Sequence, residues 1–220
     1  MDTLAQLYQE RFESAGIQKR DRVWKILCED FFSRRVPADA TVLDLACGYG
    51  DFINNISCGR KCAVDLNPDA RRHVGSDVEF TLSAATDLSA IGRNAVDVVF
   101  TSNFLEHLKD KAECDAVLAN VFDVLKPGGR FIVLGPNIRY AYREYWDFYD
   151  HYLPLSDLSL SEGLRLAGFN IVEAIPRFLP YTMNGRTPTA DFLVKLYLRL
   201  PVAWRVLGKQ FLVTAEKPCR

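Results

Sequence analysis

The sequence has no run of about 18 apolar residues, the length that an ordinary membrane-spanning helix requires. Its first residues contain no basic region followed by an apolar stretch, so we expect no signal peptide and a cytoplasmic location. Charge of one sign is not in excess either, because 27 Lys and Arg stand against 28 Asp and Glu. We therefore expect no nucleic-acid partner, since a basic stripe is also missing.

Internal repeats and low-complexity linkers are absent as well. A length of 220 residues with 49% hydrophobic residues suits one well-buried domain, so we expect a single domain over 1–220. Of the six cysteines only Cys58 and Cys62 lie near each other, and no second pair stands at a matching spacing. The pattern favours reduced thiols over a zinc site.

Apolar segments rich in β-branched residues alternate with helical patterns, as in proteins built around a parallel sheet. Strands are predicted at residues 41–46, 61–65, 78–82, 96–101, 130–134, 169–174 and 210–215. Residues 112–125 have apolar positions at helical spacing, and Pro127 with its two following glycines ends that helix. Residues 2–32 are predicted to form one or two amphipathic helices, so that 1–35 is a helical cover outside the sheet.

A glycine-rich loop follows the first predicted strand, in the sequence VLDLACGYGDF at 42–52. Gly48 and Gly50 let the backbone turn sharply and approach a ligand closely, and a helix is expected directly afterwards. Asp44 lies inside the strand, where its charge would repel a pyrophosphate but suits a ligand with ammonium and sulfonium charges. The loop lacks the third glycine of a dinucleotide-binding fingerprint.

Three further segments accompany this loop. Asp65 ends the second strand, where an acid can hold both hydroxyls of a ribose. The fourth strand ends in TSNFLEH at 101–107, and the sequence LKPGG at 125–129 precedes the fifth. Together these segments resemble the class I S-adenosylmethionine-dependent methyltransferases over residues 40–135.

The resemblance implies a Rossmann-like α/β fold, a mostly parallel seven-stranded sheet of order 3-2-1-4-5-7-6 with helices on both faces. It also implies S-adenosylmethionine as cofactor and S-adenosylhomocysteine as product. Ala84 stands where many relatives carry an acid for the adenine, so backbone groups or Asp87 would replace it; Asp87 serves equally well as a helix N-cap. The expected donor-binding residues are Asp44, Ala46, Gly48, Tyr49, Gly50, Asp65, Leu66, Ala84, Ala85 and Asn103.

The acceptor site is expected at two places. His107 follows the fourth strand, near the donor methyl, although a packing role is an equal alternative. The aromatic segment 139–152 contains Asp147, Asp150 and His151, which suits a pocket that stacks on rings and binds hydroxyls. The expected catalytic residues are His107, His151 and Asp150. No metal is expected, although Asp147, Asp150 and His151 are one set that could bind a divalent ion.

Residues 191–209 interleave leucines with Lys and Arg and are interrupted at Pro201. They could pack on the domain, contact a membrane surface weakly, form a dimer or cover the acceptor. We expect 136–156 and 177–209 to be acceptor-side cap segments. The predicted activity is O-methylation of a small-molecule, saccharide or natural-product hydroxyl. N- or C-methylation and a non-catalytic donor-binding partner protein remain alternatives, and the oligomeric state is left open.

Overall fold

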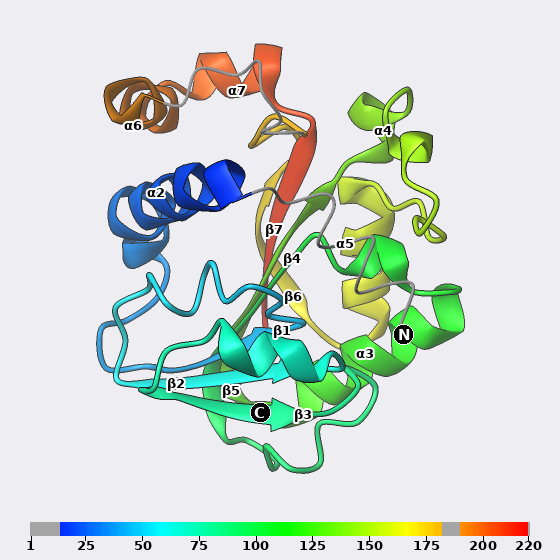
Figure 1. Cartoon of the computed structure of the whole chain (residues 1–220). Helices are drawn as coiled ribbons and strands as arrows, with labels where there is room; N and C mark the ends of the chain where they lie inside the picture. Colours follow the sequence, from blue (N-terminus) through cyan, green and yellow to red (C-terminus); the bar gives the residue numbers. More distant parts are fainter. Residues whose placement is uncertain (1–13, 182–189, 220) are drawn as a thin grey trace.

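The computed structural model describes residues 14–181 and 190–219, which form one seven-stranded sheet of order β3-β2-β1-β4-β5-β7-β6 (Figure 1). All neighbouring strands are parallel except β7, which is antiparallel to both β5 and β6. The predicted Rossmann-like sheet and its strand order are confirmed. The strands are β1 (Thr41–Leu45), β2 (Arg60–Asp65), β3 (Val78–Leu82), β4 (Val96–Ser102), β5 (Leu125–Pro136), β6 (Asn170–Ile175) and β7 (Gln210–Glu216).

Ten helical elements connect or cover the strands within the described residues. The α-helices are α2 (Ser14–Asp30), α3 (Lys111–Val124), α4 (Ile138–Ala141), α5 (Asp157–Leu166), α6 (Asp191–Arg199) and α7 (Pro201–Leu207). The short 3₁₀ helices are η1 (Phe32–Arg34), η2 (Pro68–Arg72), η3 (Leu105–His107) and η4 (Tyr145–Asp147). Residues 2–13 of the predicted N-terminal helices and residues 182–189 of the predicted cap lie outside the described part.

Six predicted strands agree with the structure to within one residue at each end, and β5 is the exception. It begins at Leu125, directly after α3, instead of at residue 130. Leu125 pairs with Val96 across an irregularity in the β4–β5 register, and Gly128 takes a left-handed φ of 77°. The glycines that were expected to form a turn are therefore an irregular part of the strand.

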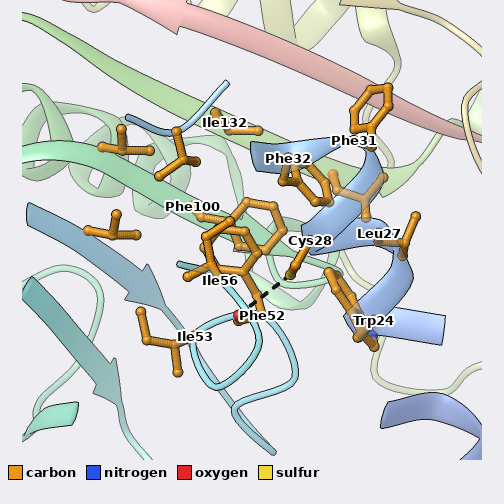
Figure 2. Close-up of a cluster of buried hydrophobic side chains, with 14 of the residues drawn as sticks. Trp24, Leu27, Cys28, Phe31, Phe32, Phe52, Ile53, Ile56, Phe100 and Ile132 are labelled. Carbon is orange, nitrogen blue, oxygen red and sulfur yellow. Dashed lines mark hydrogen bonds between the residues drawn. The ribbon is translucent and has the colours of Figure 1, made fainter. Parts of the chain in front are cut away.

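The core has two layers, one on each face of the sheet, and Figure 1 shows α2, α6 and α7 on one side and α3 and α5 on the other. In the first layer Phe52 stacks on Phe100 at 3.7 Å between ring centroids, and Phe32 packs edge-on against both (Figure 2). The Cys28 thiol donates a hydrogen bond to the carbonyl oxygen of Phe52 at 3.7 Å. Helix α2 thus holds the segment that follows the glycine-rich loop.

That segment is not the regular helix predicted to begin directly after the glycines. Residues 50–55 form turns, in which the carbonyl of Gly50 accepts from the N–H of Asn54 and that of Phe52 accepts from Ile56. The aromatic packing of Phe52 and the side-chain bonds of Asn54 to the backbone of His73 and Gly75 fix these turns. Tertiary contacts have overridden the helical pattern here.

The connection between β6 and β7 leaves and re-enters at the carboxyl edge of the parallel strands. Ile175 at the end of β6 pairs with Leu212, and Gln210 at the start of β7 pairs with Pro136 at the end of β5. Helices α6 and α7 belong to this connection and meet at Pro201, where the sequence predicted a break. Helix α6 packs along α2, and Arg22 and Asp191 join the two helices in an ion pair.

The described residues contain no helix that is both long and apolar enough to cross a membrane. Helices α6 and α7 nevertheless expose several large apolar side chains to solvent. These are Phe192, Leu196, Leu200, Val202, Val206 and Leu207.

Candidate active site

The loop after β1 is held in left-handed backbone conformations. Ala46, Gly48 and Gly50 have φ angles of 57°, 52° and 69°. A Cβ built on Gly48 would meet no atom within 4 Å, whereas one built on Gly50 would lie 2.8 Å from Nδ2 of Asn54. Gly50 is therefore needed for packing inside the protein, and Gly48 leaves an open surface that a ligand can approach closely.

Asp44 lies beneath this loop, with only 3% of its surface exposed. Its Oδ2 accepts a hydrogen bond from the backbone N–H of Ile53 at 3.2 Å. Burial raises the pKa of the Asp44 carboxyl well above its usual range, because desolvation disfavours the charged form. The Asp44 side chain thus connects β1 to the backbone at Ile53, after the glycine-rich loop.

Asp65 joins the ends of β1 and β2. Its two carboxylate oxygens accept hydrogen bonds from the backbone N–H groups of Gly48 and Asn67, each at 2.8 Å. The side chain is partly exposed beside the open face of Gly48, and the neighbouring Leu66 is exposed. A ribose placed on Gly48 would find this carboxylate within reach.

The segment after β3 completes the same edge. Ala84 and Ala85 are partly buried, and the N–H of the preceding Ser83 donates to the carbonyl oxygen of Asp65 at 3.0 Å. Asp87 is exposed, and its Oδ1 accepts from the N–H of Ser89 at 3.1 Å. Hydrogen bonding with the Ser89 side chain, and then with this N–H, lowers the pKa of the Asp87 carboxyl. Its side chain therefore caps a local turn, the alternative that the sequence left open.

Helix α2 contacts the outer side of the loop. Arg20 forms an ion pair with Asp51 at 2.9 Å, and its guanidinium lies 4.4 Å from the ring centroid of Tyr49. Tyr49 packs in turn on the ring of His73 at 4.6 Å between centroids. The described part of the N-terminal segment therefore covers the loop as well as the core.

A second group of polar side chains lies at the end of β4. Glu106 and His107 belong to η3, and His151 comes from the stretch after η4. One ligand atom from each of the three lies within 4.8 Å of those of the other two. The backbone explains why they meet, because the carbonyl of Glu106 accepts from the N–H groups of Tyr152 and Leu153 at 2.8 and 3.1 Å.

The neighbours of His107 determine which of its ring nitrogens carries the proton in the neutral form. Its Nδ1 lies 2.9 Å from the backbone carbonyl oxygen of Asp150 and 3.4 Å from the Asp150 carboxylate. A carbonyl oxygen can only accept a hydrogen bond, so in the neutral imidazole the proton is on Nδ1. The lone pair of His107 is consequently on Nε2.

Glu106 is buried, with 4% of its surface exposed. Burial, and to a smaller extent the nearby Asp150, raise the pKa of its carboxyl while His107 lowers it, and the net effect is a pKa of about 7. The carboxyl ionises near neutral pH and is therefore able to exchange a proton or bind a cation there.

Aromatic side chains surround His151. Phe148 stacks on its ring at 4.9 Å between centroids, and Tyr145 is buried with its hydroxyl donating to the carbonyl of Leu153. Tyr181, from the connection after β6, places its hydroxyl 3.4 Å from Nδ1 of His151. Tyr140 is half-buried, and the other aromatics of the segment are exposed: Tyr142, Trp146, Tyr149 and Tyr152. The segment is therefore core on one side and open surface on the other.

The glycine-rich loop, the Asp65 carboxylate beside it and the strand order are accompanied by a sequence match. Residues 43–133 match the sequence model of a methyltransferase domain. This part of the chain is similar to the class I S-adenosylmethionine-dependent methyltransferase family. S-adenosylmethionine is the cofactor of this family. The open face of Gly48 beside the Asp65 carboxylate fits such a group.

Curated relatives of the chain include proteins of quinone biosynthesis. It is 29% identical over 143 residues to the ubiquinone biosynthesis O-methyltransferase of Xanthomonas axonopodis pv. citri, covering 60% of this chain and 59% of that one. It is 31% identical over 142 residues to the ubiquinone/menaquinone biosynthesis C-methyltransferase UbiE of Psychromonas ingrahamii, covering 60% and 55%. The chain thus spans a little over half the length of these relatives.

A solved structure shows the same fold over nearly the whole length. The S-adenosylmethionine-dependent methyltransferase of Archaeoglobus fulgidus superposes with a TM-score of 0.65 and 19% identity, covering 98% of this chain and 100% of the other. The part of the chain after residue 133, which lies outside the sequence match, therefore belongs to the same architecture.

The structure brings the predicted site residues together in two groups. Ala46, Gly48, Tyr49, Gly50 and Asp65 lie at the loop after β1, with Asp44 below them. Asn103 has a left-handed φ of 48° and leads into η3, where the catalytic candidates His107, Asp150 and His151 meet.

One member of the second group was missed by the sequence analysis. Glu106 was seen only as the residue before His107, and the metal alternative was placed on Asp147, Asp150 and His151. Its type and position after β4 were visible in the sequence. Its burial and its approach to His151 depend on the backbone bonds to residues 152 and 153, which no local pattern indicates.

Proposed function

We propose that this methyltransferase transfers a methyl group to the hydroxyl of a small-molecule acceptor bound next to η3. The observation that carries the proposal is the position of Glu106, His107 and His151 beside the donor loop. β1 and β4 are neighbours in the sheet, and the Thr101 hydroxyl at the end of β4 donates to the carbonyl of Leu45 at 2.8 Å. The two groups therefore stand at adjacent strand ends, where open α/β sheets bind ligands.

On the donor side, we propose that Asp65 holds the ribose and that the backbone around Gly48 lies against the cofactor. The partly buried backbone of Ala84 and Ala85 would contact the adenine. When bound, S-adenosylmethionine supplies a methyl group on a sulfonium sulfur, and transfer leaves S-adenosylhomocysteine. Asp44 acts indirectly, because its hydrogen bond to Ile53 fixes the loop.

On the acceptor side, the residues around η3 manage the proton of the hydroxyl. The acceptor oxygen forms its bond to the methyl carbon as the carbon–sulfur bond breaks, and the hydroxyl proton passes to a protein base. Asp150, His107 and His151 border that place. Positioning the two reactants accounts for much of the rate enhancement in such a displacement, and a placed base contributes further.

The aromatic side chains favour a planar or apolar acceptor over a highly hydroxylated one. Phe148, Tyr145 and Tyr181 enclose His151, and stacking on rings is what such surfaces offer. Relatives named O- and C-methyltransferases of quinone biosynthesis support a ring-bearing acceptor. The alternative acceptors for methyl transfer are saccharide hydroxyls, and nitrogen or carbon atoms of other small molecules.

We also propose that segments 136–156 and 177–209 form a cap on this side. Tyr181 supports the proposal because it reaches His151 from the second segment. Helices α6 and α7 extend away along α2, and their exposed apolar side chains alternate with Lys195, Arg199 and Arg205. This composition favours a weak contact of the cap with an anionic membrane surface.

The test is methyl transfer itself. Purified protein would be incubated with S-adenosylmethionine and a panel of phenols, catechols, quinols, amines and saccharides, with homocysteine formation measured after hydrolysis of the product. Phenolic or catecholic acceptors are expected to give turnover, and mass spectrometry would identify the methylated atom. Donor binding by calorimetry without turnover on any acceptor would favour the non-catalytic binding protein instead.

A further inference from the structure

We propose that Glu106, His107 and His151 bind a divalent first-row transition-metal ion at the acceptor side of the domain. Two imidazole nitrogens and one carboxylate oxygen form a ligand set that holds such ions and leaves other coordination positions open. No metal was expected from the sequence, because the three residues are brought together only by the fold.

The distances fit a site that closes slightly on binding. Ligand atoms bonded at about 2.1 Å stand roughly 3–4.2 Å apart in tetrahedral or octahedral geometry. The ligand atoms of Glu106, His107 and His151 already lie within 4.8 Å of one another. Small rotations of the side chains would therefore bring them into range without moving the backbone.

The orientation of His107 is that of a metal ligand. Histidines that bind metals usually donate their other ring N–H to a backbone carbonyl or a carboxylate, which fixes the tautomer. Nδ1 of His107 has both partners, at 2.9 Å from the carbonyl and 3.4 Å from the carboxylate of Asp150. This leaves the lone pair of Nε2 for the ion.

The buried carboxyl of Glu106 gives the cluster a group that a bound ion would stabilise. Glu106 is 4% exposed, and no Lys or Arg of the described chain forms an ion pair with it. A buried carboxylate is costly unless it is paired, and a divalent ion would pair it.

The role of the ion rests on the proposed function. Bound next to the acceptor, it would coordinate the acceptor oxygen through an open position and lower the pKa of that hydroxyl. Asp150, whose carboxylate borders His107, would then accept the proton. His107 and His151 would act as ligands, and the base would be Asp150.

Metal binding can be measured without any turnover. Metal-free protein would be titrated with Mn²⁺ and free Mn²⁺ followed by electron paramagnetic resonance; Mn²⁺ is chosen because the six cysteines favour softer ions. One site per chain is expected. Glu106→Gln and His151→Ala should each weaken it by roughly 100-fold. His73→Ala, which removes the one histidine outside the cluster, is the matched control and should bind as the wild type does.

Two outcomes would overturn the site: no saturable Mn²⁺ binding, or equal weakening by His73→Ala and His151→Ala. S-adenosylmethionine affinity, measured on every variant, shows that the fold is intact. If Mn²⁺ binds as expected and no acceptor is methylated, the proposed function fails and the metal site stands. If acceptors are methylated at full rate in EDTA and Mn²⁺ does not bind, the metal site fails and the proposed function stands.

Discussion

The backbone N–H of Gly48 donates a 2.8 Å hydrogen bond to Oδ2 of Asp65, which connects the loop after β1 to the end of β2. This bond orients the Asp65 carboxylate next to the open side of Gly48. Its second oxygen is held in the same way by the N–H of Asn67. Asp65 is therefore already positioned for the proposed ribose contact.

Replacing this acid should weaken the binding of the methyl donor. Asp65→Ala removes a charged acceptor from two ribose hydroxyls, so a loss of about 1.5–3 kcal/mol in donor binding is expected. Isothermal calorimetry with S-adenosylmethionine measures it. Asp69→Ala is the control, because Asp69 forms only an exposed ion pair with Arg72. Equal affinity in Asp65→Ala and the wild type would mean that another acid holds the ribose.

The two histidines at η3 should affect turnover and not donor binding. His107→Ala and His151→Ala are each expected to lose roughly 100-fold or more in rate, because proton handling or metal binding is removed. Single-turnover kinetics at saturating donor, alongside donor calorimetry, separates the two effects. A variant that keeps the wild-type rate would identify its histidine as a packing residue.

The burial of Asp44 predicts a pH-dependent stability. Its pKa is near 3.8 in the unfolded chain and raised in the folded protein, so above about pH 4 the folded state binds more protons. The contribution of Asp44 to the free energy of unfolding therefore falls as pH rises toward the folded pKa. Asp44→Asn keeps an acceptor for Ile53 but cannot titrate.

Chemical denaturation of the wild type and Asp44→Asn from pH 4 to pH 8 checks this expectation. The wild type should lose stability relative to the variant as pH increases. If the difference in stability between the two proteins stays constant with pH, folding does not raise the pKa of the Asp44 carboxyl.

Trp204 should stabilise the domain through α2. Its ring packs on Phe31 and Phe178 at 6.0 and 5.2 Å between centroids, and its Nε1 donates to the carbonyl of Tyr197. Trp204→Ala is expected to cost about 3 kcal/mol by thermal or chemical denaturation. Displacing α7 should also raise the Michaelis constant of the acceptor while donor affinity is unchanged. The exposed Trp146→Ala, as a control for stability, should cost much less.

The exposed face of α6 and α7 predicts binding to anionic lipid. Phe192 and Val202 are 67% and 71% exposed, so Phe192→Ser with Val202→Ser should reduce flotation with phosphatidylglycerol vesicles. Leu166→Ser, an exposed apolar residue on α5, is the control and should float like the wild type. Light scattering without lipid tests the alternative that this face forms a dimer. Identical flotation of all three proteins would contradict the lipid contact.

The sheet could be predicted from sequence because buried parallel strands are continuous apolar segments. β1 to β4, β6 and β7 were placed within one residue for that reason. Helix α5 was missed, although Ser156 and Ser159 form a capping box at its start. The residues after Gly50 were predicted as a helix but form turns. Phe52 is held by contacts with α2 and β4, and the Asn54 side chain is bonded to the backbone of His73, which follows η2.

The candidate site was only partly predictable. The loop around Gly48 and the acid Asp65 follow from a local pattern at strand ends. The meeting of Glu106 with His151 depends on backbone bonds from Glu106 to Tyr152 and Leu153, far along the chain, for which the sequence has no periodic signal. The contact of Tyr181 with His151 is equally non-local.

The order of the strands has a consequence for how the chain acquires its structure during synthesis. β6 touches the rest of the sheet only through β7, which is the later of the two in sequence and lies between β5 and β6. A ribosome releases residues 170–175 well before residues 210–216. β6 therefore stays unpaired until β7 has been synthesised. Such long-range pairing is slow and leaves an apolar edge open to aggregation. Completion of this edge is therefore expected to be a late step in folding, and the step at which a chaperone would be of most use.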